Sequence, residues 1–126
     1  MLRGDEVRIH GSGEISRDFC HVKNVVQANL LAATTDETSA LNEAYNIALG
    51  RRTTLDELFV LLRDRLAAGH PRLAGLKPVY GPPRSGDVTH SLADIDKARR
   101  LLGYEPTHSI ERGLDESLAW YERNLK

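Results

Sequence analysis

The alternation of apolar and polar positions along the chain predicts short strands interleaved with helices. Val7 and Ile9 alternate with polar neighbours and stop at a Gly-Ser-Gly turn, beyond which residues 18–22 form a second extended run. Apolar residues then recur at helical spacing over residues 24–34, where Asn24 can cap the start. We therefore expect two short strands joined by a glycine turn and followed directly by a helix.

The middle of the chain predicts a loop, a strand and a well-marked helix. Residues 35–42 are small and polar, which is typical of a loop, and residues 44–49 form a compact apolar run ended by a glycine. Thr54 and Glu57 have the spacing of a capping box, so a helix should begin at Thr54 and stop by Gly69. Its apolar stripe is Leu55, Leu58, Phe59, Leu62 and Leu66.

The segment from Gly69 to Gly86 is rich in glycine and proline, and we expect it to be a long functional loop with a strand-like P-V-Y in its middle. A Pro-Pro pair near its end forbids a helix, and Gly86 allows the backbone to turn. Arg84 and Asp87 therefore lie across a tight bend, with their opposite charges facing one small site.

Two capped helices are expected to close the chain. Asp94 can cap the first, whose apolar face is followed by the stop signals Gly103 and Pro106, and Ser109 can cap a second that runs to the chain end. The face of the first consists of Ile95, Ala98 and Leu102, and the stripe of the second consists of Ile110, Leu114, Leu118, Tyr121 and Leu125. Acidic residues fall early in the last helix, and Arg123 and Lys126 fall late, as the helix dipole favours. The predicted fold class is α/β, a small lobe of about four helices and several short strands.

Length and charge narrow the function classes. A length of 126 residues is typical of one domain, so we expect a single domain over 1–126. Seventeen Lys and Arg against eighteen Asp and Glu give a net charge of -1, which favours neither nucleic acid nor an anionic membrane as partner. Cys20 is the single cysteine, which excludes an intramolecular disulfide. With neither a membrane span nor a signal peptide in the sequence, we expect a cytoplasmic protein.

Two arginines are the candidates for binding chemistry. Arg17 and Arg84 lie near glycines in loops or at strand edges, and a guanidinium fork suits phosphate oxygens because it can donate two parallel hydrogen bonds. The alternative is that Arg17 pairs with Asp18, and Arg84 with Asp87, as ordinary surface ion pairs. From the residues alone, the ion-pair interpretation is the simpler one.

Other candidate sites are weaker. The Gly-Ser-Gly turn has no third glycine and leads into a strand, so it does not fit a phosphate-binding loop. The five histidines (His10, His21, His70, His90 and His108) lack the spacing of metal ligands, and no metal is expected. Asp94, Asp96 and Glu105 suit a helix cap and a solvated face. The pairs Arg51-Arg52 and Arg99-Arg100 suit exposed helix ends.

Three strings together carry a family resemblance. One string resembles the C-terminal lobe of extended short-chain dehydrogenase/reductases that act on nucleotide sugars. It consists of R-S-G-D, a serine four residues on, and then A-D-I-D-K-A-R-R-L-L-G-Y-E-P. Within them it is most similar to the UDP-N-acetylglucosamine 4-epimerases. G-S-G-E-I-S-R-D-F-C-H-V and A-Y-N-I-A-L-G-R-R-T-T-L resemble the same lobe in the same order, so the resemblance covers essentially the whole chain.

The resemblance implies a role for four residues in binding a UDP-sugar. Arg17 and Arg84 would hold the diphosphate, and Asp87 would accept hydrogen bonds from the ribose hydroxyls. Ser91 would line the hexose pocket, where a small residue leaves room for an N-acetyl group. The plainer alternatives are that Asp87 stabilises its turn and that Ser91 is an ordinary serine at a strand end.

The catalytic motifs of such enzymes are not found in this sequence. The relatives transfer hydride to and from NAD with Tyr-x-x-x-Lys and a Ser or Thr, whereas the four tyrosines here are followed four positions later by Leu49, Arg84, His108 and Leu125. The glycine fingerprint of a dinucleotide-binding half is also missing. We therefore expect no catalytic residue and no cofactor bound by this chain, NAD belonging to the full-length relatives.

Three hypotheses follow from that resemblance. The chain is a C-terminal portion of a UDP-sugar 4-epimerase that contributes UDP-sugar contacts and is inactive alone, or a stand-alone module for nucleotide-sugar binding or protein interaction, or a truncated product without function. Since the nucleotide-binding half would cover part of the lobe, the surface near Val7, Phe19 and Ile47 should be partly uncovered. We expect a homodimer that buries this face.

Overall fold

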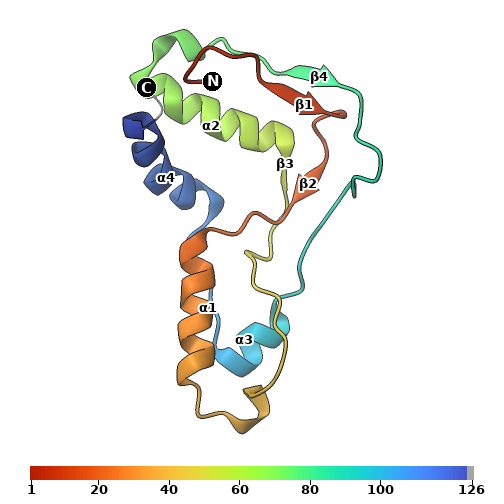
Figure 1. The fold of residues 1–126 in the computed structure, drawn as a ribbon, viewed down its shortest axis with the longest axis vertical. Coiled ribbons are helices and arrows are strands. Elements are labelled where there is room, and N and C mark those ends of the chain that lie inside the picture. Colours follow the sequence, from red (N-terminus) through yellow and green to blue (C-terminus); the bar gives the residue numbers. More distant parts are fainter. Residues whose placement is uncertain (125–126) are drawn as a thin grey trace.

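The computed structural model describes residues 1–124, which form an elongated arrangement of helices and short strands (Figure 1). The helices are α1 (Val22–Thr34), α2 (Leu55–Gly69), α3 (Asp96–Leu102) and α4 (Ile110–Asn124). The strands are β1 (Arg8–His10), β2 (Ser16–Arg17), β3 (Thr53–Thr54) and β4 (Val79–Gly81), and single 3₁₀ turns cover η1 (Thr38–Ala40) and η2 (Pro71–Leu73). The expected small α/β lobe is confirmed over the described residues.

The strands form two small sheets. β1 runs parallel to β4, with Ile9 opposite Tyr80, and β2 runs antiparallel to β3, with Arg17 opposite Thr53. The two strands expected around the Gly-Ser-Gly turn therefore belong to different sheets. The second of them occupies Ser16–Arg17, so the strand predicted over 18–22 was placed too late in the chain: its last residue, Val22, already begins α1.

The main buried cluster lies between α1, η1 and α3. It consists of Ala28, Ala40, Ala48, Ile95, Ala98, Leu102 and Tyr104. Figure 1 shows these elements at one end of the molecule, with α2, β1 and β4 at the other. All three residues of the predicted apolar face of α3 are buried here, which confirms that part of the sequence pattern.

Helix α1 begins at Val22, and Asn24 does not cap it. His21 occupies the cap position, with its ring Nδ1 accepting from the Lys23 amide at 3.4 Å. Asn24 is fully buried inside the helix, where its side-chain oxygen accepts from the backbone amides of Thr107 and His108, each at 3.0 Å. The asparagine thus satisfies backbone groups 83 and 84 residues away along the chain rather than its own helix, which local sequence cannot reveal.

The predicted strand over 44–49 is also wrong, because the segment is irregular, with a bend at Ala48, and pairs with no strand of the described chain. Side chains satisfy its backbone instead. The Tyr104 hydroxyl donates to the Ala48 carbonyl at 2.8 Å, and the Asp18 carboxylate accepts from the amides of Leu49 and Gly50. A short apolar run has the sequence pattern of a strand, but it forms a strand only where a neighbouring strand pairs with its backbone.

The remaining helix predictions are confirmed with small shifts. In α2, the Thr54 hydroxyl accepts from the Glu57 amide and the Glu57 carboxylate accepts from the Thr54 amide, a complete capping box. Helix α3 begins two residues after Asp94, whose carboxylate accepts from the Asp96 amide at 2.9 Å. The Ser109 hydroxyl accepts from the Arg112 amide at the start of α4. Leu125 and Lys126 lie outside the described residues.

None of the helices in the described part of the chain is long and apolar enough to cross a bilayer.

Candidate functional site

The turn from Arg84 to Asp87 has the predicted geometry. The Asp87 amide donates to the Arg84 carbonyl at 3.3 Å, and Gly86 between them has a φ of 82°, which a residue with a Cβ rarely adopts. Both charged side chains lie on the same side of the turn, where they line one cavity. The sequence prediction that they face a common site is confirmed.

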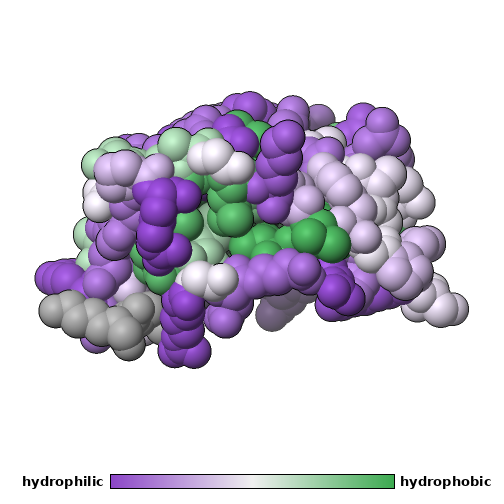
Figure 2. All heavy atoms as spheres, turned by 90° about the horizontal axis from the view of Figure 1, so that it is seen from above, coloured by the Kyte–Doolittle hydropathy of each residue, from purple (hydrophilic) through white to green (hydrophobic). Residues whose placement is uncertain are grey.

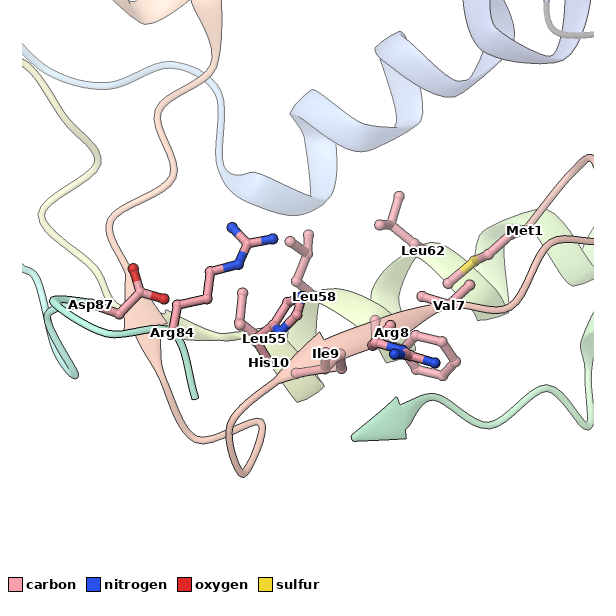
Figure 3. A pocket seen from close by; sticks show the side chains of 11 residues that line it. Met1, Val7, Arg8, Ile9, His10, Leu55, Leu58, Leu62, Arg84 and Asp87 are labelled. Carbon is pink, nitrogen blue, oxygen red and sulfur yellow. The ribbon is translucent and has the colours of Figure 1, made fainter. Parts of the chain in front are cut away.

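That cavity, of about 270 Å³, has a polar end and an apolar end. Figure 3 shows Arg84 and Asp87 at one end and Met1, Val7 and Leu62 at the other, with side chains of β1 and α2 between them. His10 is part of its wall, and its Nδ1 lies 3.2 Å from the Pro82 carbonyl. Arg84 and Asp87 also line a neighbouring cavity beside the Gly-Ser-Gly turn.

Arg17 reaches the same place from β2. Its guanidinium Nη2 lies 3.9 Å from Asp87 Oδ1, and its Nη1 donates to the Ser16 carbonyl at 2.9 Å. The pairing considered from sequence, Arg17 with Asp18, does not occur: Asp18 accepts from backbone amides of Leu49, Gly50 and Ala93. The fold therefore brings Arg17 to Asp87, 70 residues away along the chain, although Arg17, unlike Arg84 and Asp87, is not part of the cavity wall.

Ser91 lies at the border of this site. It is exposed and is not part of the cavity wall, but its amide donates to the Ser16 carbonyl at 3.1 Å. Ser16, in turn, donates its amide to the Thr89 carbonyl at 3.0 Å, and its hydroxyl lies 2.9 Å from His90 Nδ1. The segment 89–91 thus runs parallel to β2 and forms a single β-bridge with it, between Ser16 and His90.

Three features at or beside the candidate site were not predicted from the sequence: His10 in the cavity wall, the hydrogen bonds of Asp18, and the contact between Ser16 and His90. The alternation of apolar and polar residues placed His10 on a strand, but a cavity wall depends on what packs across that strand. Asp18 and His90 bond to partners 31 to 75 residues away along the chain. No local pattern reports such contacts.

The ionisable groups around the site do not form an acid–base pair or a metal cage. Tyr80 donates its hydroxyl to Asp56 Oδ1 at 2.9 Å, and this hydrogen bond raises the pKa of the tyrosine. Cys20 lines a different cavity, with Phe19 and His21, and burial raises the pKa of its thiol. The described residues contain no group of three or more His, Cys, Asp or Glu side chains placed to hold a metal ion. Two guanidinium groups and a carboxylate beside an apolar wall suit an anionic ligand that also carries hydroxyl groups.

Comparison with known proteins gives one consistent result. Residues 1–48 match the model of the NAD dependent epimerase/dehydratase family. A putative UDP-glucose 4-epimerase of Methanocaldococcus jannaschii is 32% identical over 124 residues, which are 98% of this chain and 37% of that protein. The chain therefore spans little more than a third of the length of the curated relatives that it matches.

Solved structures agree with the sequence match. UDP-glucose 4-epimerase from Thermotoga maritima, with UDP-glucose, is 44% identical and superimposes with a TM-score of 0.85 over 100% of this chain and 38% of that one. UDP-N-acetylglucosamine 4-epimerase from Methanobrevibacter ruminantium, in complex with UDP-N-acetylmuramic acid, is 34% identical, with a TM-score of 0.83 over 97% and 36%. The resemblance to the C-terminal lobe of extended short-chain dehydrogenase/reductases that epimerise nucleotide sugars is thereby confirmed.

Proposed function

We propose that this chain supplies the UDP-sugar contacts of a nucleotide-sugar 4-epimerase. Arg17 and Arg84 hold the diphosphate, Asp87 accepts hydrogen bonds from the ribose, and Ser91 borders the space for the sugar. The observation that carries the proposal is that Arg84 and Asp87 line one cavity and that Arg17, from a segment far away in sequence, approaches Asp87 to 3.9 Å. Relatives solved with UDP-glucose and with UDP-N-acetylmuramic acid support the ligand class.

The polar end of the cavity suits the diphosphate and ribose of such a ligand, and the apolar end suits its base. Guanidinium groups donate paired hydrogen bonds to phosphate oxygens, and the ionised carboxylate of Asp87 is an acceptor for hydroxyl groups. The apolar wall formed by β1 and α2 can cover the flat face of a base. The small side chain of Ser91 leaves space for an N-acetylated sugar, so we place UDP-N-acetylglucosamine and UDP-N-acetylgalactosamine among the substrates of the whole enzyme.

The chain alone should not catalyse epimerisation. The chemistry of the matched family depends on NAD, and the 126-residue sequence contains neither the Tyr-x-x-x-Lys pair nor a dinucleotide fingerprint. Incubation of the purified chain with NAD and UDP-N-acetylglucosamine should leave the sugar unchanged by chromatography. Conversion above the level of a protein-free sample would contradict this part of the proposal.

A second candidate is a stand-alone binding or interaction module, which the uncovered apolar surface favours. The α1 residues Val22 and Leu30 expose 65% and 62% of their surface, and a hollow of about 460 Å³ lies between the N-terminal segment, α2 and α4. Figure 2, seen from the α2 end of the molecule, shows apolar side chains gathered in a hollow there. An adjacent reading frame that encodes a dinucleotide-binding half would favour the epimerase; without one, the module or a non-functional product is favoured.

Calorimetric titration with UDP and with uridine tests the binding proposal. We expect weak, salt-sensitive binding with UDP preferred, because the diphosphate adds charge-assisted contacts while these 126 residues span little more than a third of the relatives that bind such ligands. Arg84→Ala should weaken UDP binding about tenfold or more, whereas the exposed Arg100→Ala on α3 should not. Equal affinity for UDP and uridine, or equal loss in both variants, would overturn the proposal.

A further inference from the structure

The carboxylate of Asp18 joins three segments of the chain. Its Oδ1 accepts from the Leu49 amide at 2.9 Å, and its Oδ2 accepts from the amides of Gly50 at 3.0 Å and Ala93 at 3.4 Å. The Asp18 side chain and the residues Leu49 and Ala93 are partly buried, whereas Gly50 is exposed. An ionised carboxylate, which only accepts hydrogen bonds, suits three donors at once.

Asp18 also continues a backbone ladder. Segment 89–91 runs parallel to β2, since the Ser16 amide donates to Thr89 and the Ser16 carbonyl accepts from Ser91. Two residues further along both segments, the Ala93 amide reaches Asp18 Oδ2. The carboxylate therefore takes the place of the next backbone acceptor along β2, and it also accepts from the amides of Leu49 and Gly50 in a third segment.

Arg17 lies between these two attachments. Ser16, on one side, accepts both the Arg17 guanidinium and the Ser91 amide on its carbonyl oxygen, and Asp18 is on the other side. These two attachments, at Ser16 and at Asp18, thus fix Arg17 relative to the segment that carries Asp87 and Ser91. Without the second attachment, the two segments can separate beyond Ser91.

We propose that Asp18 is a positioning residue for the UDP-sugar site: its carboxylate holds Ala93, which follows Asp87 and Ser91 on the same segment, against the end of β2 and so helps to set where Arg17 lies relative to both. This inference rests on the proposed function. Asp18 contacts the backbone amides of Leu49, Gly50 and Ala93, and the proposal assigns it no contact with the ligand.

The test is a double-mutant cycle of Asp18→Asn and Arg17→Ala, read as the affinity for UDP. The asparagine keeps the shape but places an amide donor against at least one backbone donor. Asp18→Asn should weaken UDP binding about five- to tenfold in the wild-type background and less than about twofold with Arg17→Ala, because it acts through that arginine. Equal weakening in both backgrounds would overturn the proposal.

Asn24→Ala is the control for a merely structural effect, since the Asn24 side chain bonds to the backbone at Thr107 and His108. It should lower the free energy of unfolding, yet its effect on UDP affinity should not depend on Arg17. Titrations are compared at a temperature where circular dichroism shows every variant folded.

Amide hydrogen exchange gives a readout that needs no UDP. In Asp18→Asn, exchange should accelerate at Leu49, Gly50 and Ala93 and also at Ser91, whereas Asn24→Ala should leave Ser91 protected. Unchanged exchange at Ser91 and Ala93 would overturn the proposal that Asp18 holds this segment. A wild-type chain that shows this protection but no affinity for UDP would contradict the proposed function and leave the attachment by Asp18 supported.

Discussion

At the scale of the residue, Glu116 on α4 is the most strongly perturbed carboxylate. Lys23 on α1 donates a hydrogen bond to its Oε2, and its Oε1 lies 3.1 Å from His108 Nε2 and 3.5 Å from Arg112 Nε. The hydrogen bond from Lys23, reinforced by the nearby charges, lowers the pKa of Glu116 to about 2. The His108 ring is stacked on that of His21, with centroids 4.9 Å apart. Glu116 thus links α4 to α1 and to the segment before α4.

This perturbed pKa predicts how stability depends on pH. The carboxyl of Glu116 takes up a proton more readily in the unfolded chain, near its ordinary pKa of 4.5, than in the folded chain, near 2. Its contribution is therefore fully present above about pH 4.5 and is lost as the pH falls toward 2. Glu116→Gln should remove this part of the pH dependence, so urea unfolding between pH 2 and 5 should show a flatter profile for the variant.

Glu14→Gln is the matched control, because Glu14 is exposed and lies in the turn before β2, away from α4. Its unfolding free energy should follow the wild-type profile over the same range. A Glu116→Gln profile parallel to wild type would show that the contact with Lys23 does not persist in solution.

At the scale of the element, the Gly-Ser-Gly turn is shaped by helix α2. Gly13 is buried with a φ of 86°, and a Cβ built on it would overlap the Asp56 carboxylate in the first turn of α2. That carboxylate also receives the Tyr80 hydroxyl from β4, and the Asp56 amide donates to the Gly13 carbonyl at 3.1 Å. The turn, the helix and the strand therefore meet at one glycine.

A pair of glycine variants separates backbone strain from this crowding. Gly13→Ala and Gly86→Ala each place an alanine at nearly the same positive φ, which costs about 1 kcal/mol, but a Cβ at Gly86 meets nothing within 4 Å. Gly13→Ala should cost about 1 kcal/mol more, because Asp56 must turn away and lose its bond to Tyr80. Urea unfolding measures both, and equal losses would show that the Asp56 side chain moves aside without cost.

Elements with their signals close together in sequence could be predicted, and others could not. Thr54 and Glu57 are three residues apart and form the capping box of α2 as expected. The segment 44–49 has the composition of a strand, yet its backbone bonds to Asp18 and Tyr104, which lie far away along the chain. The same holds for the candidate site. The Arg84–Asp87 turn could be predicted from local sequence. The contact of Arg17 with Asp87 and the hydrogen bonds of Asp18 could not, because they depend on the fold.

At the scale of the whole molecule, the uncovered apolar surface predicts association. Val7, Phe19 and Ile47 are each only partly buried, and Val22, Val26 and Leu30 on α1 are each at least half exposed. We expect a homodimer that buries the surface near Val7, Phe19 and Ile47, since uncovered apolar surface favours self-association, and the exposed stripe of α1 is a further apolar surface available to it. Light scattering at micromolar concentration should give twice the monomer mass.

Val26→Glu provides the disruptive variant for this prediction, and Asp36→Lys, in the exposed segment after α1, provides the control. Burying a glutamate without a partner is unfavourable, so Val26→Glu should yield a monomer while the control remains dimeric. A wild-type monomer that also fails to bind a hydrophobic dye would contradict the prediction.

Asp18 and its hydrogen-bond partner Ala93 are synthesised at different times during translation. A ribosome that has just added Asp18 must add 75 more residues before Ala93 exists, which takes roughly 4 to 15 seconds at about 5–20 residues per second. During that interval the edge of β2 that later receives residues 89–91 has no partner from its own chain and is open to pairing with another. Translation that stops anywhere between these two positions releases a polypeptide in which Arg17 is present and the segment that fixes it is incomplete.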